Sequence, residues 1–291
     1  NYTGEGKYPM NTIEVKNLTK KYKDFTLDNI SFYLPEGSIM GLVGENGAGK
    51  STTIKLIMNA ISRDSGEINV LGCDNQSPGF EKLKNEIGVV LDEAYFPEVI
   101  TAANVNSIMK HTYSNWDEKA YFDYLDKFSL PKDKVFKDFS RGMKMKLAIA
   151  VALSHNPRLL ILDEATSGLD PMVRDEILEI FNDFTRDERN SILLSSHIIS
   201  DLEKICDYIA FIHKGRLMLF EEKDRLLEEY TVIKVSKSDF EALPPEAVKG
   251  KKVTNFCVEA LVLKHKIPPS LETQHTTLED IVLFLAKGDG R

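Results

Sequence analysis

The sequence predicts an α/β protein whose centre is a parallel β-sheet covered by helices on both faces. An apolar segment, 38–43, runs into a glycine-rich turn and then into a helix over 51–60. Two short apolar runs, 158–162 and 191–194, lack the polar alternation of half-exposed strands, as is typical of parallel strands buried on both faces. A helix with one apolar stripe lies between these two runs, which completes a β-α-β unit.

The remaining elements are predicted in chain order. The chain before the glycine-rich turn is expected to form a β-rich edge, because its apolar residues recur with period two. These residues are Ile13, Val15, Ile30, Phe32 and Leu34. A helical insertion is expected over about 95–156, with an apolar stripe behind a capping-box pair formed by Ser114 and Asp117. The stripe consists of Tyr121, Tyr124, Leu125 and Phe128.

The two ends of the chain are expected to lie outside the main domain. Residues 1–10 are interpreted as a native tail or an expression remnant, and 11–220 as the main domain. Residues 221–291 are expected to form a small accessory region. It contains a strand over 231–235, a break at Pro244 and Pro245, and a last helix from Thr276.

Composition excludes several classes of function. The 291 residues carry a formal net charge of -8, which gives no electrostatic footprint for a nucleic acid partner. The three cysteines show neither disulfide nor zinc spacing, and this favours a reducing, cytoplasmic location. No apolar stretch approaches the ~20 residues that cross a bilayer, so any membrane role must come through a partner.

One segment matches a phosphate-binding loop, G-x-x-x-x-G-K-[ST], between a predicted strand and a predicted helix. Its residues are Gly44, Glu45, Asn46, Gly47, Ala48, Gly49, Lys50 and Ser51, followed by Thr52. The glycines allow backbone N–H groups to face phosphate oxygens, Lys50 would reach the β and γ phosphates, and Ser51 would ligate Mg²⁺. The alternative is a glycine turn with a surface lysine.

Two adjacent acids, Asp163 and Glu164, end an apolar strand at the edge of the sheet where ligands bind in such folds. Asp163 would hold Mg²⁺, and Glu164 would act as the general base that activates a water. The alternative is a helix N-cap pair after a core strand.

The order of these motifs, followed by 167–170 and by Ser195-Ser196-His197, resembles the ABC ATPase family over about residues 11 to 220. The resemblance implies a P-loop NTPase with a RecA-like parallel core, ATP and Mg²⁺ as ligands, and a dimer with Asp170 at its interface. It also implies that His197 contacts the γ-phosphate and the attacking water. A lone histidine after a strand is otherwise a cap or surface residue.

The family's Leu-Ser-Gly-Gly-Gln turn corresponds here to Phe-Ser-Arg-Gly-Met at 139–143, which matches only at Ser140 and Gly142. The resemblance implies that these two residues contact the γ-phosphate held by the partner subunit. Ser140 as an ordinary N-cap is the alternative.

The resemblance also implies roles for two further residues, Tyr22 and Asp92. Tyr22 is similar to the aromatic residue that stacks on adenine, with a packing tyrosine as the alternative. Asp92-Glu93 stands where the family has a glutamine at Mg²⁺, so Asp92 is either a metal ligand or a solvated loop acid.

The predicted function is that of the ATP-hydrolysing subunit of an ABC transporter, peripheral on the cytoplasmic face of the membrane. Its partners would be a second ATPase subunit and a separate membrane permease. The segment 88–101, the Phe-Ser-Arg-Gly-Met turn and the end of the accessory region resemble bacterial export-type ATPases for drugs, antimicrobial peptides or lipids. A soluble ABC ATPase acting on nucleic acid or ribosomes, and an inactive nucleotide-binding module, are the alternatives.

Overall fold

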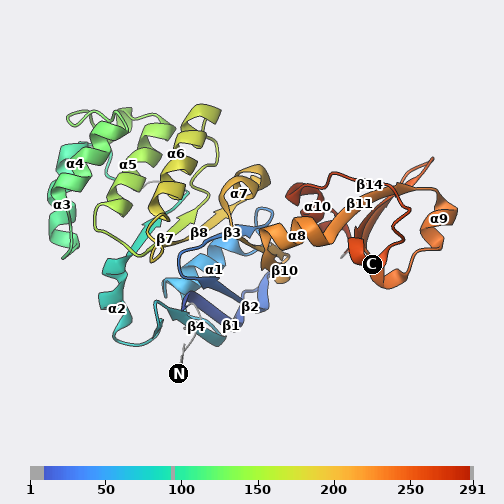
Figure 1. Cartoon of the computed structure of the whole chain (residues 1–291). Coiled ribbons are helices and arrows are strands. Elements are labelled where there is room, and N and C mark those ends of the chain that lie inside the picture. Colours follow the sequence, from blue (N-terminus) through green and yellow to red (C-terminus); the bar gives the residue numbers. More distant parts are fainter. Residues whose placement is uncertain (1–9, 93–95, 289–291) are drawn as a thin grey trace, which may run out of the picture.

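The computed structural model describes residues 10–92 and 96–288 and confirms the α/β fold (Figure 1). Its centre is a six-stranded sheet with the strand order β10-β9-β3-β8-β7-β6, parallel except for β10 at one edge. The strands are β3 (Ile39–Val43), β6 (Ile87–Val90), β7 (Leu159–Asp163), β8 (Ser191–Ser196), β9 (Tyr208–His213) and β10 (Arg216–Glu222). Every residue of β3, β7 and β8 is buried, which explains why these strands lack polar alternation.

The predicted β-rich edge is an antiparallel sheet with the strand order β2-β1-β4-β5. Its strands are β1 (Asn11–Lys21), β2 (Thr26–Pro35), β4 (Ser65–Val70) and β5 (Cys73–Asp74). Its apolar face shares a hydrophobic core with α1 (Lys50–Ile57) and one face of the parallel sheet. Helix α1 ends earlier than predicted because Asn59 adopts the left-handed conformation, with φ of 53°.

The predicted helical insertion lies beside β6 and β7, at the upper left of Figure 1. Its elements are α3 (Ala102–Thr112), α4 (Glu118–Lys127), η2 (Phe136–Asp138) and α5 (Arg141–Leu153), preceded by α2 (Phe80–Leu83) and η1 (Lys84–Glu86). The predicted capping box at Ser114 is wrong. Asp117 itself caps α4 by accepting from the Ala120 amide at 2.9 Å, and the reciprocal box joins Thr101 and Asn104 at α3.

The second face of the parallel sheet is covered by α5, α6 (Pro171–Phe184) and α7 (Ile199–Ile205). Asp170 and Pro171 start α6 as predicted, because the Asp170 carboxylate accepts from the Val173 amide at 3.1 Å. The strand, helix, strand order thus brings the carboxyl ends of β3, β7 and β8 to one edge.

The chain beyond β10 forms a C-terminal unit that projects to the right in Figure 1. A four-stranded antiparallel sheet, β12-β13-β11-β14, packs with α10. The elements are α8 (Lys223–Glu229), β11 (Tyr230–Val235), α9 (Lys237–Glu241), η3 (Pro245–Ala247), β12 (Val248–Val253), β13 (Val258–Leu263), η4 (Lys264–Lys266), β14 (Thr273–Gln274) and α10 (Leu278–Gly288). The apolar stripe of α10 belongs to the same core as α7, so this unit adjoins the main body.

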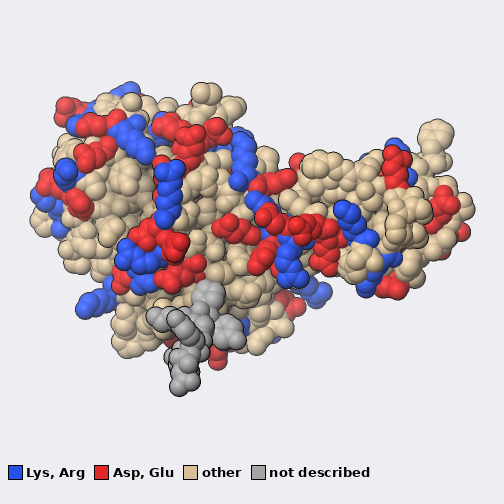
Figure 2. Space-filling view, in the orientation of Figure 1, with Lys and Arg blue, Asp and Glu red and all other residues tan. Residues whose placement is uncertain are grey.

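Charges of both signs are interspersed over the face seen in Figure 2, and acidic side chains gather where the main body meets the C-terminal unit. Within 10–92 and 96–288, no helix is long and apolar enough to cross a membrane.

Candidate active site

The phosphate-loop segment 44–49 lies between the end of β3 and the start of α1. Gly49 is the N-cap of α1 with φ of 118°, a conformation that disfavours side chains. A Cβ at Gly49 would lie 2.9 Å from Leu27 Cδ1, and one at Gly44 would lie 2.5 Å from the carbonyl oxygen of Ile212. Only glycine permits these approaches. Because Gly49 has no side chain to cap α1, the first amide groups of the helix are available to an anion.

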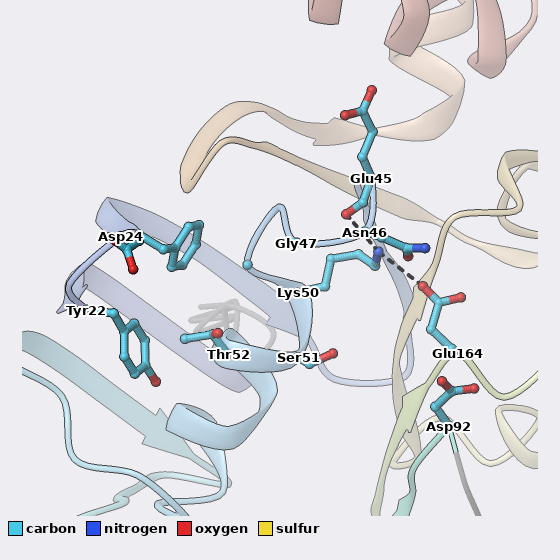
Figure 3. Close-up of a pocket in the computed structure, with 12 residues that line it drawn as sticks. Tyr22, Asp24, Glu45, Asn46, Gly47, Lys50, Ser51, Thr52, Asp92 and Glu164 are labelled. Atoms are coloured by element: carbon cyan, nitrogen blue, oxygen red, sulfur yellow. Dashed lines mark hydrogen bonds and ion pairs between the residues drawn. The ribbon is translucent and has the colours of Figure 1, made fainter.

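Lys50 is buried at the base of this loop and bridges two segments. Its Nζ donates to the carbonyl oxygen of Gly44 at 2.7 Å. It also lies 3.1 Å from Oε1 of Glu164, an ion pair drawn in Figure 3. Both side chains are largely shielded from water, with 5% and 11% exposure, so their attraction is screened less than on the surface. Lys50 and Glu164 therefore form a largely buried ion pair.

The two acids after β7 have different partners. Asp163 accepts a hydrogen bond from the Ser195 hydroxyl on the neighbouring strand β8. Glu164 adopts the left-handed conformation, with φ of 53°, which is rare for residues other than glycine and is concentrated at functional sites. Its Oε2 lies 2.7 Å from Nδ1 of His197 at the end of β8. Glu164 thus connects Lys50 to His197.

A cavity of about 580 Å³ opens beside Lys50 and Glu164 (Figure 3). The described residues that line it are Tyr22, Asp24, Phe25, Glu45, Asn46, Gly47, Gly49, Lys50, Ser51, Thr52, Asp92 and Glu164. Tyr22 stands at the end of the cavity away from Lys50, and the residue is 46% exposed. The aromatic ring and the anion-binding loop are therefore separated along one cavity, as the two ends of a nucleotide require.

Four predicted site residues lie behind or beside the lining rather than in it. Gly44 and Ala48 are buried in the turn of the loop. Asp163 lies one residue behind Glu164, and His197 reaches the site through Glu164.

Ser140, Gly142 and Asp170 do not line this cavity either. The Ser140 hydroxyl accepts from the Met143 amide at 3.2 Å as the N-cap of α5, and Asp170 caps α6. Gly142 faces Val173 of α6, since an added Cβ would lie 3.4 Å from Val173 Cγ1. Within one chain, Ser140 and Asp170 therefore act as helix caps.

The oxygen donors near the loop fit a magnesium ion that is also bound by phosphates. Ser51 and Asp92 line the cavity, and Asp163 directly precedes Glu164, which also lines it. Across the described part of the chain, no three acidic, histidine or cysteine side chains form a ready-made metal site. Mg²⁺ commonly uses one or two carboxylates and completes its shell with water and substrate phosphates.

Comparison with known proteins identifies the family. An ABC transporter family model matches residues 27–167. A bacitracin transport ATP-binding protein of Enterococcus faecalis is 33% identical over 85% of this chain and 81% of its own length. The chain belongs to the ABC transporter ATP-binding proteins. A lantibiotic transport ATP-binding protein of Streptococcus pyogenes is 36% identical over 73% of this chain and 91% of its own.

Solved structures agree with this membership. The ATP-binding subunit of an ABC transporter superposes with a TM-score of 0.68 at 29% identity, over 75% of this chain and 92% of that one. This ABC protein is therefore an ATPase, and the predicted family, fold and enzymatic activity are confirmed. The alternatives, a nucleic acid or ribosome factor and an inactive module, are not favoured.

Two residues that depart from the family pattern, Asp92 and Arg141, are in contact in this ABC protein. Asp92 follows β6, and its Oδ1 lies 3.3 Å from Nη2 of Arg141, the first residue of α5. The prediction left Asp92 as a metal ligand or a solvated acid, and it did not foresee this ion pair. Its neighbour Glu93 lies outside the described residues.

Three residues of the site escaped the sequence analysis. Asp24 and Phe25 line the cavity from the β1–β2 turn, and Ser195 holds Asp163. The Phe25 ring centroid lies 6.4 Å from that of Tyr22. Asp24 and Phe25 are close in sequence to Tyr22, and this could have indicated that they belong to the site. The role of Ser195 could not be found in this way, because it depends on strand order.

Proposed function

We propose that this chain binds ATP and Mg²⁺ in the cavity of Figure 3 and hydrolyses ATP as a dimer that drives a separate membrane permease. One observation carries the proposal: Glu164 is held between Lys50 and His197 beside a phosphate loop. A carboxylate in this position can accept a proton from water while the lysine faces the phosphates.

The individual roles follow from the placement of the side chains. Tyr22 stacks on adenine, and the loop amides with Thr52 surround the phosphates. Ser51 and Asp163 hold Mg²⁺, and the ion would neutralise phosphate charge. Asp92 would become a further ligand only in place of its ion pair with Arg141. Glu164 is the general base, and His197, which it holds at 2.7 Å, contacts the γ-phosphate and the attacking water.

The partner subunit would complete the site. Ser140 and Gly142 stand at the N-terminus of α5, where a hydroxyl and amide groups attract an anion. We propose that they contact the γ-phosphate bound by the partner subunit and that Asp170 lies at the dimer interface. These residues do not line the cavity of their own chain, where Ser140 and Asp170 serve as helix caps, and this supports the assignment.

The chain consists of an ATPase domain and a C-terminal unit, and its relatives are named for transport. We propose residues 11–220 as the ATPase domain, with the helical subdomain at about 95–156, and 221–291 as an accessory region. The relatives named for bacitracin and lantibiotic transport support an exporter. The chain would then lie on the cytoplasmic face of the membrane, bound to its permease.

ATP-dependent dimerisation tests this proposal. The Glu164→Gln variant should dimerise with ATP and stay monomeric with ADP, as measured by light scattering. Adding Ser140→Ala should abolish the dimer. Ser236→Ala is the matched control because Ser236 is also an exposed N-cap serine, accepting from the Asp239 amide at 3.1 Å in the C-terminal unit. Both changes remove a cap worth ~1 kcal/mol.

The control should leave the ATP-dependent dimer intact. A Glu164→Gln chain that stays monomeric at saturating ATP, alone and with its permease, would contradict the dimer and favour a nucleotide-binding protein without a permease.

A further inference from the structure

The candidate ATP cavity has an unfavourable charge for a ligand that carries several negative charges. Its described lining contains four acids, Asp24, Glu45, Asp92 and Glu164, and one basic residue, Lys50. The formal charge of these side chains is therefore four negative and one positive, or -3. Like charges within a few ångströms repel, so acids close to the phosphates must be compensated for ATP to bind.

Asp92 and Glu164 are the two acids on the side of the cavity nearest Ser51 and Lys50 (Figure 3). Glu164 is compensated by Lys50 at 3.1 Å and contacts His197. Asp92 lines the same cavity but forms no ion pair with that lysine. Among the residues that the structure describes, its ion-pair partner is Arg141, whose Nη2 lies 3.3 Å from Oδ1.

Arg141 is poorly placed for the stability of its own helix. It is the first residue of α5, where the positive end of the helix dipole opposes a positive side chain. Its guanidinium instead lies against Gly168 in the loop after β7, since a Cβ added at Gly168 would come within 2.8 Å of Arg141 Cζ. Gly168 also has φ of 67°, so a side chain there is disfavoured on two grounds. This loop leaves the guanidinium room to reach Asp92.

We propose that Arg141 is a positioning residue of the chain's own ATP site: it neutralises Asp92 so that the cavity accepts a nucleoside triphosphate. The inference rests on the proposed ATP site and assigns to Arg141 a role within one chain. The effect of losing Arg141 should therefore depend on the charge of Asp92, which a helix-capping or folding role of Arg141 would not require. Without Arg141, Asp92 becomes harmful to ATP binding, and removing the Asp92 charge restores it.

The test is a double-mutant cycle read by equilibrium binding of a fluorescent ATP analogue in EDTA, so that a metal role of Asp92 does not enter. The protein concentration is kept where light scattering shows monomers. Arg141→Ala should weaken binding about threefold to fivefold at low salt, because exposed ion pairs contribute effects of this size. The loss should shrink at high salt. Arg141→Ala with Asp92→Asn should bind within twofold of the parent, as should Arg141→Lys. Lys204→Ala is the matched control, since it breaks an equally exposed ion pair, with Asp175 at 3.0 Å, between α7 and α6.

Unchanged binding by Arg141→Ala would overturn the inference. It would also be overturned if Asp92→Asn failed to restore binding, because Arg141 would then act alone, on folding or on a partner's nucleotide. A parent chain that bound no ATP would overturn the proposed ATP site as well. A parent that binds ATP while Arg141→Ala matches it would overturn only the role of Arg141.

Discussion

Replacing Glu164 with glutamine removes one charge from the group that joins the buried Lys50 and Glu164 to His197, and it keeps the shape of the side chain. The carboxylate oxygens lie 3.1 Å from Lys50 Nζ and 2.7 Å from His197 Nδ1. A glutamine can still accept one hydrogen bond but cannot take a proton from water at neutral pH. We therefore expect binding to survive and chemistry to fail.

The expected magnitude follows from the two roles of this carboxylate. Loss of a general base lowers turnover by about 10²–10⁴, which equals about 2.7 to 5.4 kcal/mol of transition-state stabilisation. Affinity for ATP should be no weaker than in the parent, because Glu164 and a γ-phosphate compete for Lys50 and the amide competes less. The signature is a large fall in kcat without a rise in the dissociation constant.

The assay compares steady-state phosphate release with equilibrium ATP binding on the same preparation. Glu81→Gln serves as the control, since Glu81 lies on α2, is 72% exposed and forms only a local ion pair with Lys84. It should leave both quantities unchanged. Turnover of Glu164→Gln within threefold of the parent would refute the general-base role, and a tenfold weaker affinity would refute the competition for Lys50.

The other predictions concern the loop, the metal and a buried histidine. Lys50→Ala should weaken ATP binding about 10-fold to 100-fold in a fluorescence titration, whereas Lys55→Ala, exposed on the same helix, should not. If Asp92 ligates Mg²⁺, the Mg²⁺ concentration that gives half-maximal ATPase activity should rise from the parent to Asp92→Asn and again to Asp92→Ala. Asp92→Gln should hydrolyse ATP within about tenfold of the parent. Identical Mg²⁺ titration curves for all variants would exclude the metal role. Burial lowers the pKa of His155, so the unfolded chain takes up more protons and stability should fall as the pH drops below about 6.5. Urea unfolding at pH 7.5 and 5.5 should show a smaller loss for His155→Gln, and an equal loss would contradict the assignment.

The sequence alone determined the ATPase core because its signals are local. A phosphate loop is eight consecutive residues, and an apolar strand followed by acids is equally contiguous, so Lys50 and Glu164 could be assigned before their distance was known. The apolar periodicity of β1 and β2 likewise predicted their buried faces, where Ile13, Val15 and Leu34 are at most 1% exposed. The charged strand β12 escaped prediction because an edge strand does not need apolar alternation.

Only the tertiary structure decided which distant side chains meet. Strand order brings β8 beside β7, and this places Ser195 on Asp163 and His197 on Glu164, across more than 30 residues of chain. The ion pair of Asp92 with Arg141 spans 49 residues and depends on how the helical insertion packs against the sheet. No spacing encodes such contacts, because the loops between the elements can vary in length without changing the sheet edge at which the strands end.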